Sequence, residues 1–168
     1  MRAELLVVLG LVAALGCGPS EVPEPSPAES SPRAETVTIY LSTQNPNDCG
    51  EVRPVERTVG GRPTLRTGME QLLAGPTEEE RAAGLGGWFS DATRDMLISA
   101  ERRGNTAVVD FKDLRPVIPN ASSSCGSASL LAQLDSTAKQ FGASRTLYSI
   151  NGDVQAFYEW LQMTVPDA

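Results

Sequence analysis

The chain contains three cysteines and no histidine, which limits the chemistry that its side chains can perform. Serine and cysteine nucleophiles are commonly activated by histidine, and most zinc sites with few cysteines need histidine ligands. A carboxylate pair remains available, and the densest acidic cluster is Glu78, Glu79 and Glu80. Three acids in a first helical turn also stabilise the helix dipole, which explains them without catalysis. We therefore predict a non-enzymatic protein with no metal and no cofactor, and keep a wall hydrolase only as a disfavoured alternative.

The N-terminus is typical of a secretory signal that ends at a cysteine. Arg2 precedes the apolar run Leu5–Leu15, which is too short to span a bilayer. The following Ala14-Leu15-Gly16-Cys17 resembles the lipobox of bacterial lipoproteins, although Ala14 and Leu15 are swapped relative to the usual order. In that motif the cysteine receives a diacylglyceryl group and becomes the new N-terminus. The alternative is a plain signal peptide cut after a small residue, with Cys17 left as a thiol.

Three regions follow from this interpretation. Residues 1–16 form the predicted lipoprotein signal peptide, and acylated Cys17 anchors the protein in the lipid bilayer at the extracytoplasmic face of the cell membrane. Residues 17–35 are the lipid anchor and a tether rich in Pro, Ser and Glu, which has too few large apolar side chains to fold. Residues 36–168 are predicted to form one globular domain.

The net charge limits the kinds of partner that the chain can bind, and the two remaining cysteines bear on disulfide formation. The formal net charge of -7 makes the chain a poor ligand for nucleic acid, so we expect no such partner. If Cys17 is acylated, Cys49 and Cys125 remain in an oxidising compartment, and an even count favours a disulfide between them. The alternatives are two free thiols or a metal site, and two cysteines without histidine make a poor zinc site.

Alternating apolar residues predict the strands. Thr36–Ser42 alternates with a half-buried period, and Val55 and Val59 share one face of a second strand. Pro54 at the start of that strand indicates an edge, where a missing amide hydrogen is tolerated. A hairpin with strands 95–100 and 106–112 and a last strand at 145–150 complete the set.

Helical periodicity and capping residues predict two main helices. The first carries Leu65, Met69, Leu72 and Leu73 on one stripe and ends at Gly75-Pro76. It starts either at a capping box of Thr67 and Glu70 or one turn earlier at Pro63. The second main helix runs from Ser127 to Phe141. Short helices are predicted after a capping box of Thr77 and Glu80, and from Val154 to Leu161. The predicted fold class is α+β, with a small mixed or antiparallel sheet packed by the two main helices.

Two segments are candidate partner-binding surfaces. In the predicted edge strand, Val55, Glu56 and Thr58 are the candidates, with Glu56 and Thr58 on the less buried face. Trp88 and Phe89 follow the glycine-rich turn at residues 84–87, which lacks the spacing of a phosphate-binding loop. These two aromatics either pack onto the helices or act as anchors, and packing is favoured because the apolar helix stripes need covering.

Several motifs together resemble the GerMN domain of bacterial spore-germination and sporulation lipoproteins. They are Pro54-Val55-Glu56-Arg57-Thr58-Val59, Leu72-Leu73-Ala74-Gly75-Pro76-Thr77 with Gly84-Leu85, Ala107-Val108-Val109-Asp110, and Leu131 to Phe141. The resemblance implies a fold similar to the ring-building motifs of envelope secretion assemblies, with no known catalytic residues. It also implies docking onto an envelope protein or onto further copies of the chain, in a sporulation, germination or sensor-associated role. A small-ligand-binding or cell-wall-binding lipoprotein is the alternative.

Overall fold

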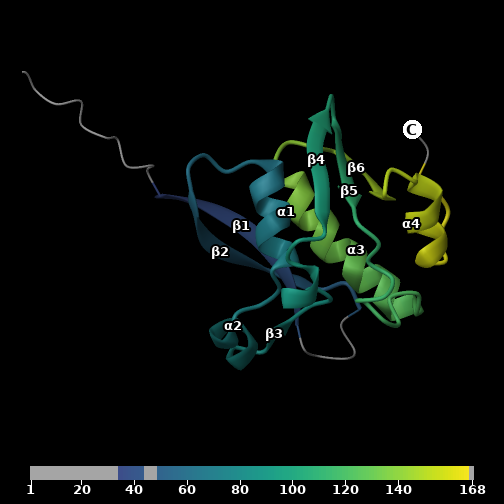
Figure 1. Ribbon diagram of the computed structural model, residues 1–168. Helices are drawn as coiled ribbons and strands as arrows, with labels where there is room; N and C mark the ends of the chain where they lie inside the picture. Colours follow the sequence, from purple (N-terminus) through teal and green to yellow (C-terminus); the bar gives the residue numbers. More distant parts are fainter. Residues whose placement is uncertain (1–33, 44–48, 167–168) are drawn as a thin grey trace, which may run out of the picture. The chain divides into compact units, whose positions relative to one another are not determined.

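The computed structural model describes residues 34–43 and 49–166, which fold into strands and helices of an α+β protein (Figure 1). The predicted fold class is therefore confirmed. The predicted signal peptide, Cys17 and the tether up to residue 33 lie outside the described residues. The elements are β1 (Ala34–Thr43), β2 (Val52–Gly60), α1 (Leu65–Leu73), α2 (Glu78–Ala82), β3 (Leu85–Gly86), η1 (Asp91–Thr93), β4 (Leu97–Arg103), β5 (Thr106–Phe111), α3 (Ser124–Lys139), β6 (Arg145–Ile150) and α4 (Val154–Trp160).

The strands form two three-stranded sheets, in place of the single small sheet predicted from the sequence. The first sheet is antiparallel, in the order β2-β1-β3. The second has the order β4-β5-β6, with β4 antiparallel and β6 parallel to β5. Apolar alternation locates a strand in the chain, but it does not say which strand will lie beside it. The division into two sheets was therefore not visible in the sequence pattern.

One hydrophobic core joins the two sheets through the main helices α1 and α3. The stripe predicted for α1 is buried, and its members contact residues of both sheets and of α3 in a single cluster. An aromatic group extends this core toward α4, with ring centroids of Phe157 and Tyr148 5.2 Å apart and Trp160 edge-on to Phe157. The C-terminal aromatics thus pack against one another and against the core. The fully buried large side chains are Tyr148, Phe111, Phe157, Ile39, Leu41, Met69, Leu72, Leu73, Leu114, Ile118, Leu130 and Leu134.

The helix starts follow their capping residues. The predicted box of Thr67 and Glu70 is wrong, because Thr64 caps α1 and the side chain of Thr67 returns the bond to the Thr64 amide. A threonine at the third helical position thus does what a glutamate does in the common form of the box. The predicted box of Thr77 and Glu80 at the start of α2 is confirmed.

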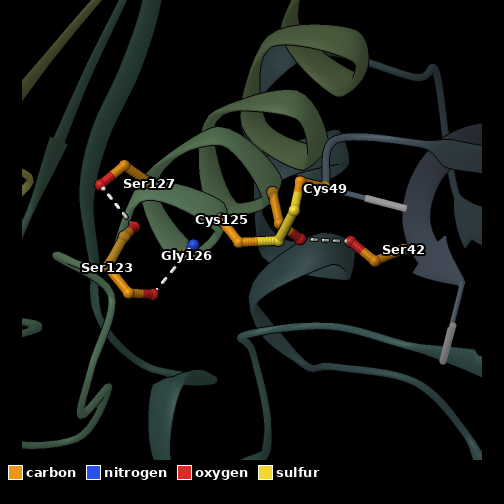
Figure 2. The surroundings of a disulfide bond; sticks show 7 residues. Ser42, Cys49, Ser123, Cys125, Gly126 and Ser127 are labelled. Carbon is orange, nitrogen blue, oxygen red and sulfur yellow. Dashed lines mark hydrogen bonds between the residues drawn. A yellow bond between two sulfur atoms is a disulfide. The ribbon is translucent and has the colours of Figure 1, made fainter. Parts of the chain in front are cut away.

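A disulfide joins Cys49 to Cys125, as the cysteine count predicted (Figure 2). The two Cα atoms are 4.9 Å apart and the residues are separated by 76 positions in the chain. Cys49 precedes β2, whereas Cys125 lies in the first turn of α3. Ser42 lies beside the bridge in Figure 2, and its hydroxyl group shares a hydrogen bond with that of Ser129 at 2.8 Å. The bridge therefore holds the β1–β2 connection against the N-terminal end of α3.

Candidate docking edge

The outer edge of β2 is the candidate site, and the hydrogen bonds of β1 show which of its backbone groups face outward. The Tyr40 amide donates to the Thr137 hydroxyl at 3.0 Å, and Ser42 pairs with Gly86 of β3. Even-numbered residues of β1 therefore turn their backbone groups away from β2. Along an antiparallel strand, successive residues turn their backbone groups alternately toward the neighbouring strand and away from it. The odd-numbered residues of β1 and β2 therefore carry the hydrogen bonds between these two strands. The even-numbered residues of β2 consequently turn their backbone groups toward the open side.

Five residues of β2 present this outward backbone: Val52, Pro54, Glu56, Thr58 and Gly60. Pro54 has no amide hydrogen, and its outward orientation means that no bond to β1 is lost there. The prediction of an edge strand is therefore confirmed, since among the described strands β2 pairs with β1 alone (Figure 1). Among the described residues, no hydrogen bond reaches the outward groups of Glu56 and Thr58. An unpaired strand edge of this kind is a template for an added strand.

The far edge of β1 is closed by helix α3. The side chain of Thr137 accepts from the Tyr40 amide, and the side-chain amide of Gln140 donates to the Thr38 carbonyl. Strand β3 then pairs with the end of β1. These contacts leave β2 as the open side of the first sheet.

The second sheet offers shorter edges. On β4, a register irregularity interrupts the pairing near Ile98, and the Arg66 guanidinium donates to the Ile98 carbonyl at 2.7 Å. On β6, the Ile150 amide donates to the Asp153 carbonyl at 3.0 Å. Irregularities and covering groups of this kind blunt an edge. The longest open run of backbone in the part of the chain that the structure describes is therefore that of β2.

Arg57 fixes this edge strand to the helices behind it. Its guanidinium donates to the Glu80 carboxylate, at 3.2 Å from Nε and 2.5 Å from Nη2. It also donates to the carbonyl oxygens of Gln71 and Gly75, both at 2.8 Å, at the end of α1. Only 11% of the Arg57 side chain and 13% of the Glu80 side chain are exposed, so solvent weakens this pair less than it would a surface pair. The clamp holds β2 in register while its other edge stays open.

The environment of Glu80 favours its charged form. Burial acts to raise the pKa of this carboxyl, but hydrogen bonds from Arg57 and from the Thr77 amide outweigh burial. The pKa of Glu80 is therefore lowered below its ordinary value. The Thr77 amide donates to the same carboxylate at 2.7 Å, so one side chain completes both the α2 capping box and the Arg57 clamp.

The candidate residues on β2 lie as their alternation predicted. Val55 is half-buried and packs against the core, on the same face of the strand as Arg57. Glu56 and Thr58 are exposed on the opposite face. Their side chains lie next to the open backbone, so a strand added there would contact both of them.

Trp88 and Phe89 are less available as anchors. Phe89 is only 3% exposed and belongs to the core, and Trp88 packs partly against it. The turn before them contains β3, and a Cβ atom on Gly87 would overlap the buried side-chain oxygen of Gln133. This close approach explains the glycine there and shows that the segment packs onto α3. The packing interpretation of both aromatics agrees with these contacts.

Two side-chain roles found in the structure could not be predicted from local sequence patterns. The capping box predicted where Glu80 lies, but not its pairing with Arg57 23 residues earlier. The Asp110 carboxylate accepts from the Ser149 hydroxyl at 2.7 Å and from the Gly152 amide at 2.8 Å, and so ties the turn after β6 to β5. Both contacts join segments that only the tertiary fold brings together.

Neither a metal centre nor a membrane span is evident in the described ranges. Within residues 34–43 and 49–166, no group of three or more histidine, cysteine, aspartate or glutamate side chains is placed to hold a metal ion. Across the same residues, no helix has the length and apolar character needed to cross a bilayer.

The fold is similar to a solved structure of the tandem GerMN domains of the sporulation protein GerM from Bacillus subtilis. The TM-score is 0.49 at 19% sequence identity, and the matched region covers 71% of this chain and 40% of that one. This chain thus spans less than half the length of that structure. No family model matches the chain, and no curated protein matches it in sequence.

Proposed function

We propose that this protein is a non-enzymatic docking module of the cell envelope, in which an extended segment of a partner protein adds to β2 as a further strand. The observation that carries the proposal is the open backbone of Glu56, Thr58 and Gly60, beside edges that are short or covered. In strand addition, main-chain hydrogen bonds supply affinity and the neighbouring side chains supply selectivity. The Arg57 clamp favours this use, because a rigid edge loses little conformational entropy when a strand binds.

Acylation of Cys17 is the second part of the proposal. The lipid would hold the domain at the extracytoplasmic face of the membrane, with residues 18–33 as the spacer. The sequence motifs further suggest a role of the sporulation or germination type, or beside a sensor kinase. A wall-binding or small-ligand-binding lipoprotein is the competing function.

The edge is tested by removing one outward amide hydrogen. Thr58→Pro deletes the Thr58 N–H, which makes no bond to β1, and Thr58→Val keeps it while removing the hydroxyl. We expect recovery of the crosslinked envelope partner to fall at least about tenfold for Thr58→Pro and little for Thr58→Val, since the lost bond also leaves a partner carbonyl unpaired. Both variants should keep a melting temperature close to that of the wild type.

A second readout is specific to strand addition. Glu56→Lys with Thr58→Lys should also weaken partner recovery without altering thermal unfolding, because lysines on an edge oppose strand pairing. In the wild type, the Glu56 and Thr58 amides should become protected from hydrogen exchange when the partner is bound. Unchanged recovery with folded Thr58→Pro protein would remove this edge from consideration, and recovery of wall fragments alone would favour wall binding.

Lipidation is tested separately with Cys17→Ser. The wild-type protein should fractionate with membranes and the variant should be released in soluble form, because the acyl chains supply the membrane affinity. Release of both proteins would contradict the lipoprotein assignment while leaving the docking edge untouched.

A further inference from the structure

A groove of about 520 Å³ lies beside the first half of β6, on a part of the surface remote in sequence from the docking edge. Its apolar lining comes from Leu147, from Val154 at the start of α4, and from Val165 and Pro166 in the tail after α4. Ligand sites in proteins commonly occupy about 300 to 1,000 Å³, so this groove is large enough for a small molecule.

The charged residues of the groove are both basic. Lys139 and Arg145 line it, and no acidic residue does, although the chain as a whole has a net charge of -7. Arg145 is exposed and forms no ion pair with any described residue, whereas the Lys139 ammonium lies 3.4 Å from the Asp135 carboxylate. Arg145 is therefore the group with free capacity to bind an anion.

The surroundings favour an anion of single charge. Lys139 is the last residue of α3, and the C-terminal end of a helix carries partial negative charge. Asp135 adds a full negative charge close to Lys139. The C-terminal end of α3 and the charge of Asp135 disfavour a phosphate dianion more than a carboxylate. An arginine can bind a carboxylate through two parallel hydrogen bonds.

The apolar part favours an aliphatic chain over a ring. No aromatic side chain lines the groove, so stacking with a base or an aromatic ring is not provided. The branched side chains of Leu147, Val154 and Val165 offer instead a surface that an extended hydrocarbon chain would cover.

We propose that this groove binds a small aliphatic carboxylate, with the carboxylate at Arg145 and the hydrocarbon chain across Leu147, Val154 and Val165. This ligand is independent of strand addition at β2, because the two surfaces share no residue.

The test uses the full chain in its native membranes and a photoactivatable diazirine analogue of decanoate. After irradiation, the crosslinked peptides should contain Leu147, Val154 or Val165, and excess decanoate should compete while decanol should not. Arg145→Gln should lower the labelling at least about fivefold, as expected for loss of a charge-assisted hydrogen bond at a partly exposed site. Val165→Asp should abolish it by placing a carboxylate among the apolar contacts.

A matched control lies in the same tail. Met163 is 43% exposed and does not line the groove, so Met163→Asp should label like the wild type. Arg145 and Met163 lie outside the hydrophobic core, and Val165 is only partly buried against it, so thermal unfolding of each variant should show that the fold is retained. Labelling confined to other peptides, equal competition by decanol, or wild-type labelling of both Arg145→Gln and Val165→Asp would each overturn the proposal.

Discussion

At the scale of single residues, Arg57 determines how an exposed strand can stay ordered. Its guanidinium bonds one carboxylate and two backbone carbonyls, so the capping of α1, the capping of α2 and the position of β2 depend on one side chain. Carbonyl groups in the last turn of a helix lack partners within the helix, and Arg57 satisfies that of Gln71 in α1 and that of Gly75 just beyond the helix. The pair with Glu80 is nearly buried, so breaking it leaves a charge without its partner.

Replacing Glu80 tests this clamp through its dependence on pH. Glu80→Gln should cost about 1 to 2 kcal/mol of unfolding free energy at neutral pH, because hydrogen bonds to charged groups are worth more than neutral ones. The folded pKa of Glu80 lies below its ordinary value of 4.5, so its contribution is complete above that pH and is lost as the pH falls toward the folded pKa. Denaturant unfolding measured between neutral and acidic pH should therefore show a smaller difference between variant and wild type in acid.

Glu79→Gln is the matched control for this experiment. Glu79 lies in the same helical turn but is exposed, so its substitution should change stability by only a few tenths of a kcal/mol through the helix dipole. Equal losses for Glu79→Gln and Glu80→Gln would show that net charge, rather than the clamp, accounts for the effect.

At the scale of elements, the ends of α1 and α3 are both marked by a glycine with positive φ, yet their surroundings differ. Gly75 has φ of +73° and a Cβ there would overlap the Phe89 carbonyl. Gly142 has φ of +80°, and a Cβ there would meet no described atom within 4 Å. Gly75 is therefore needed both for its positive φ and for the close approach of the Phe89 backbone, whereas Gly142 is needed for its positive φ alone.

This difference predicts that alanine at the two positions lowers the unfolding free energy by unequal amounts. Gly142→Ala should lower it by about 1 kcal/mol, because an L residue is strained in the left-handed region. Gly75→Ala should lower it by about 2 to 4 kcal/mol, since the overlap with backbone adds to that strain. Chemical denaturation of both variants measures the two values, and equal costs would contradict the close approach between Gly75 and the segment at Phe89.

The same elements show what the sequence could and could not predict. The stripe of α1, the Thr77 cap, the outward face of β2 and the Cys49–Cys125 pair all follow from local spacing or from a count of residues. The separation into two sheets, the Arg57 clamp and the α3 side chains on the edge of β1 depend on segments up to 102 residues apart. Local patterns carry no information about such pairings, which arise from the packing of the whole core.

At the scale of the whole molecule, the described residues form one core but two sheets, so long-range links decide whether the sheets stay together. Helix α3 contacts both sheets through core residues, and its polar side chains close one edge of the first sheet. The disulfide adds a covalent link between the N-terminal turn of α3 and the segment leading into β2 (Figure 2). Removing it should therefore loosen the first sheet against the helix without removing any part of the core.

The last prediction concerns this bridge. Substituting both Cys49 and Cys125 with serine should lower the unfolding free energy by up to roughly 4 kcal/mol, because a bridge across a long loop restricts the unfolded chain strongly. Ser42→Ala is the control, since it removes only the neighbouring hydrogen bond to Ser129 and should cost about 1 kcal/mol or less. Thiol titration of the unfolded, unreduced wild-type chain should find Cys49 and Cys125 unreactive. Stoichiometric reaction of both would rule out the bridge, and an unchanged unfolding free energy in the double variant would contradict its role in holding α3 to the first sheet.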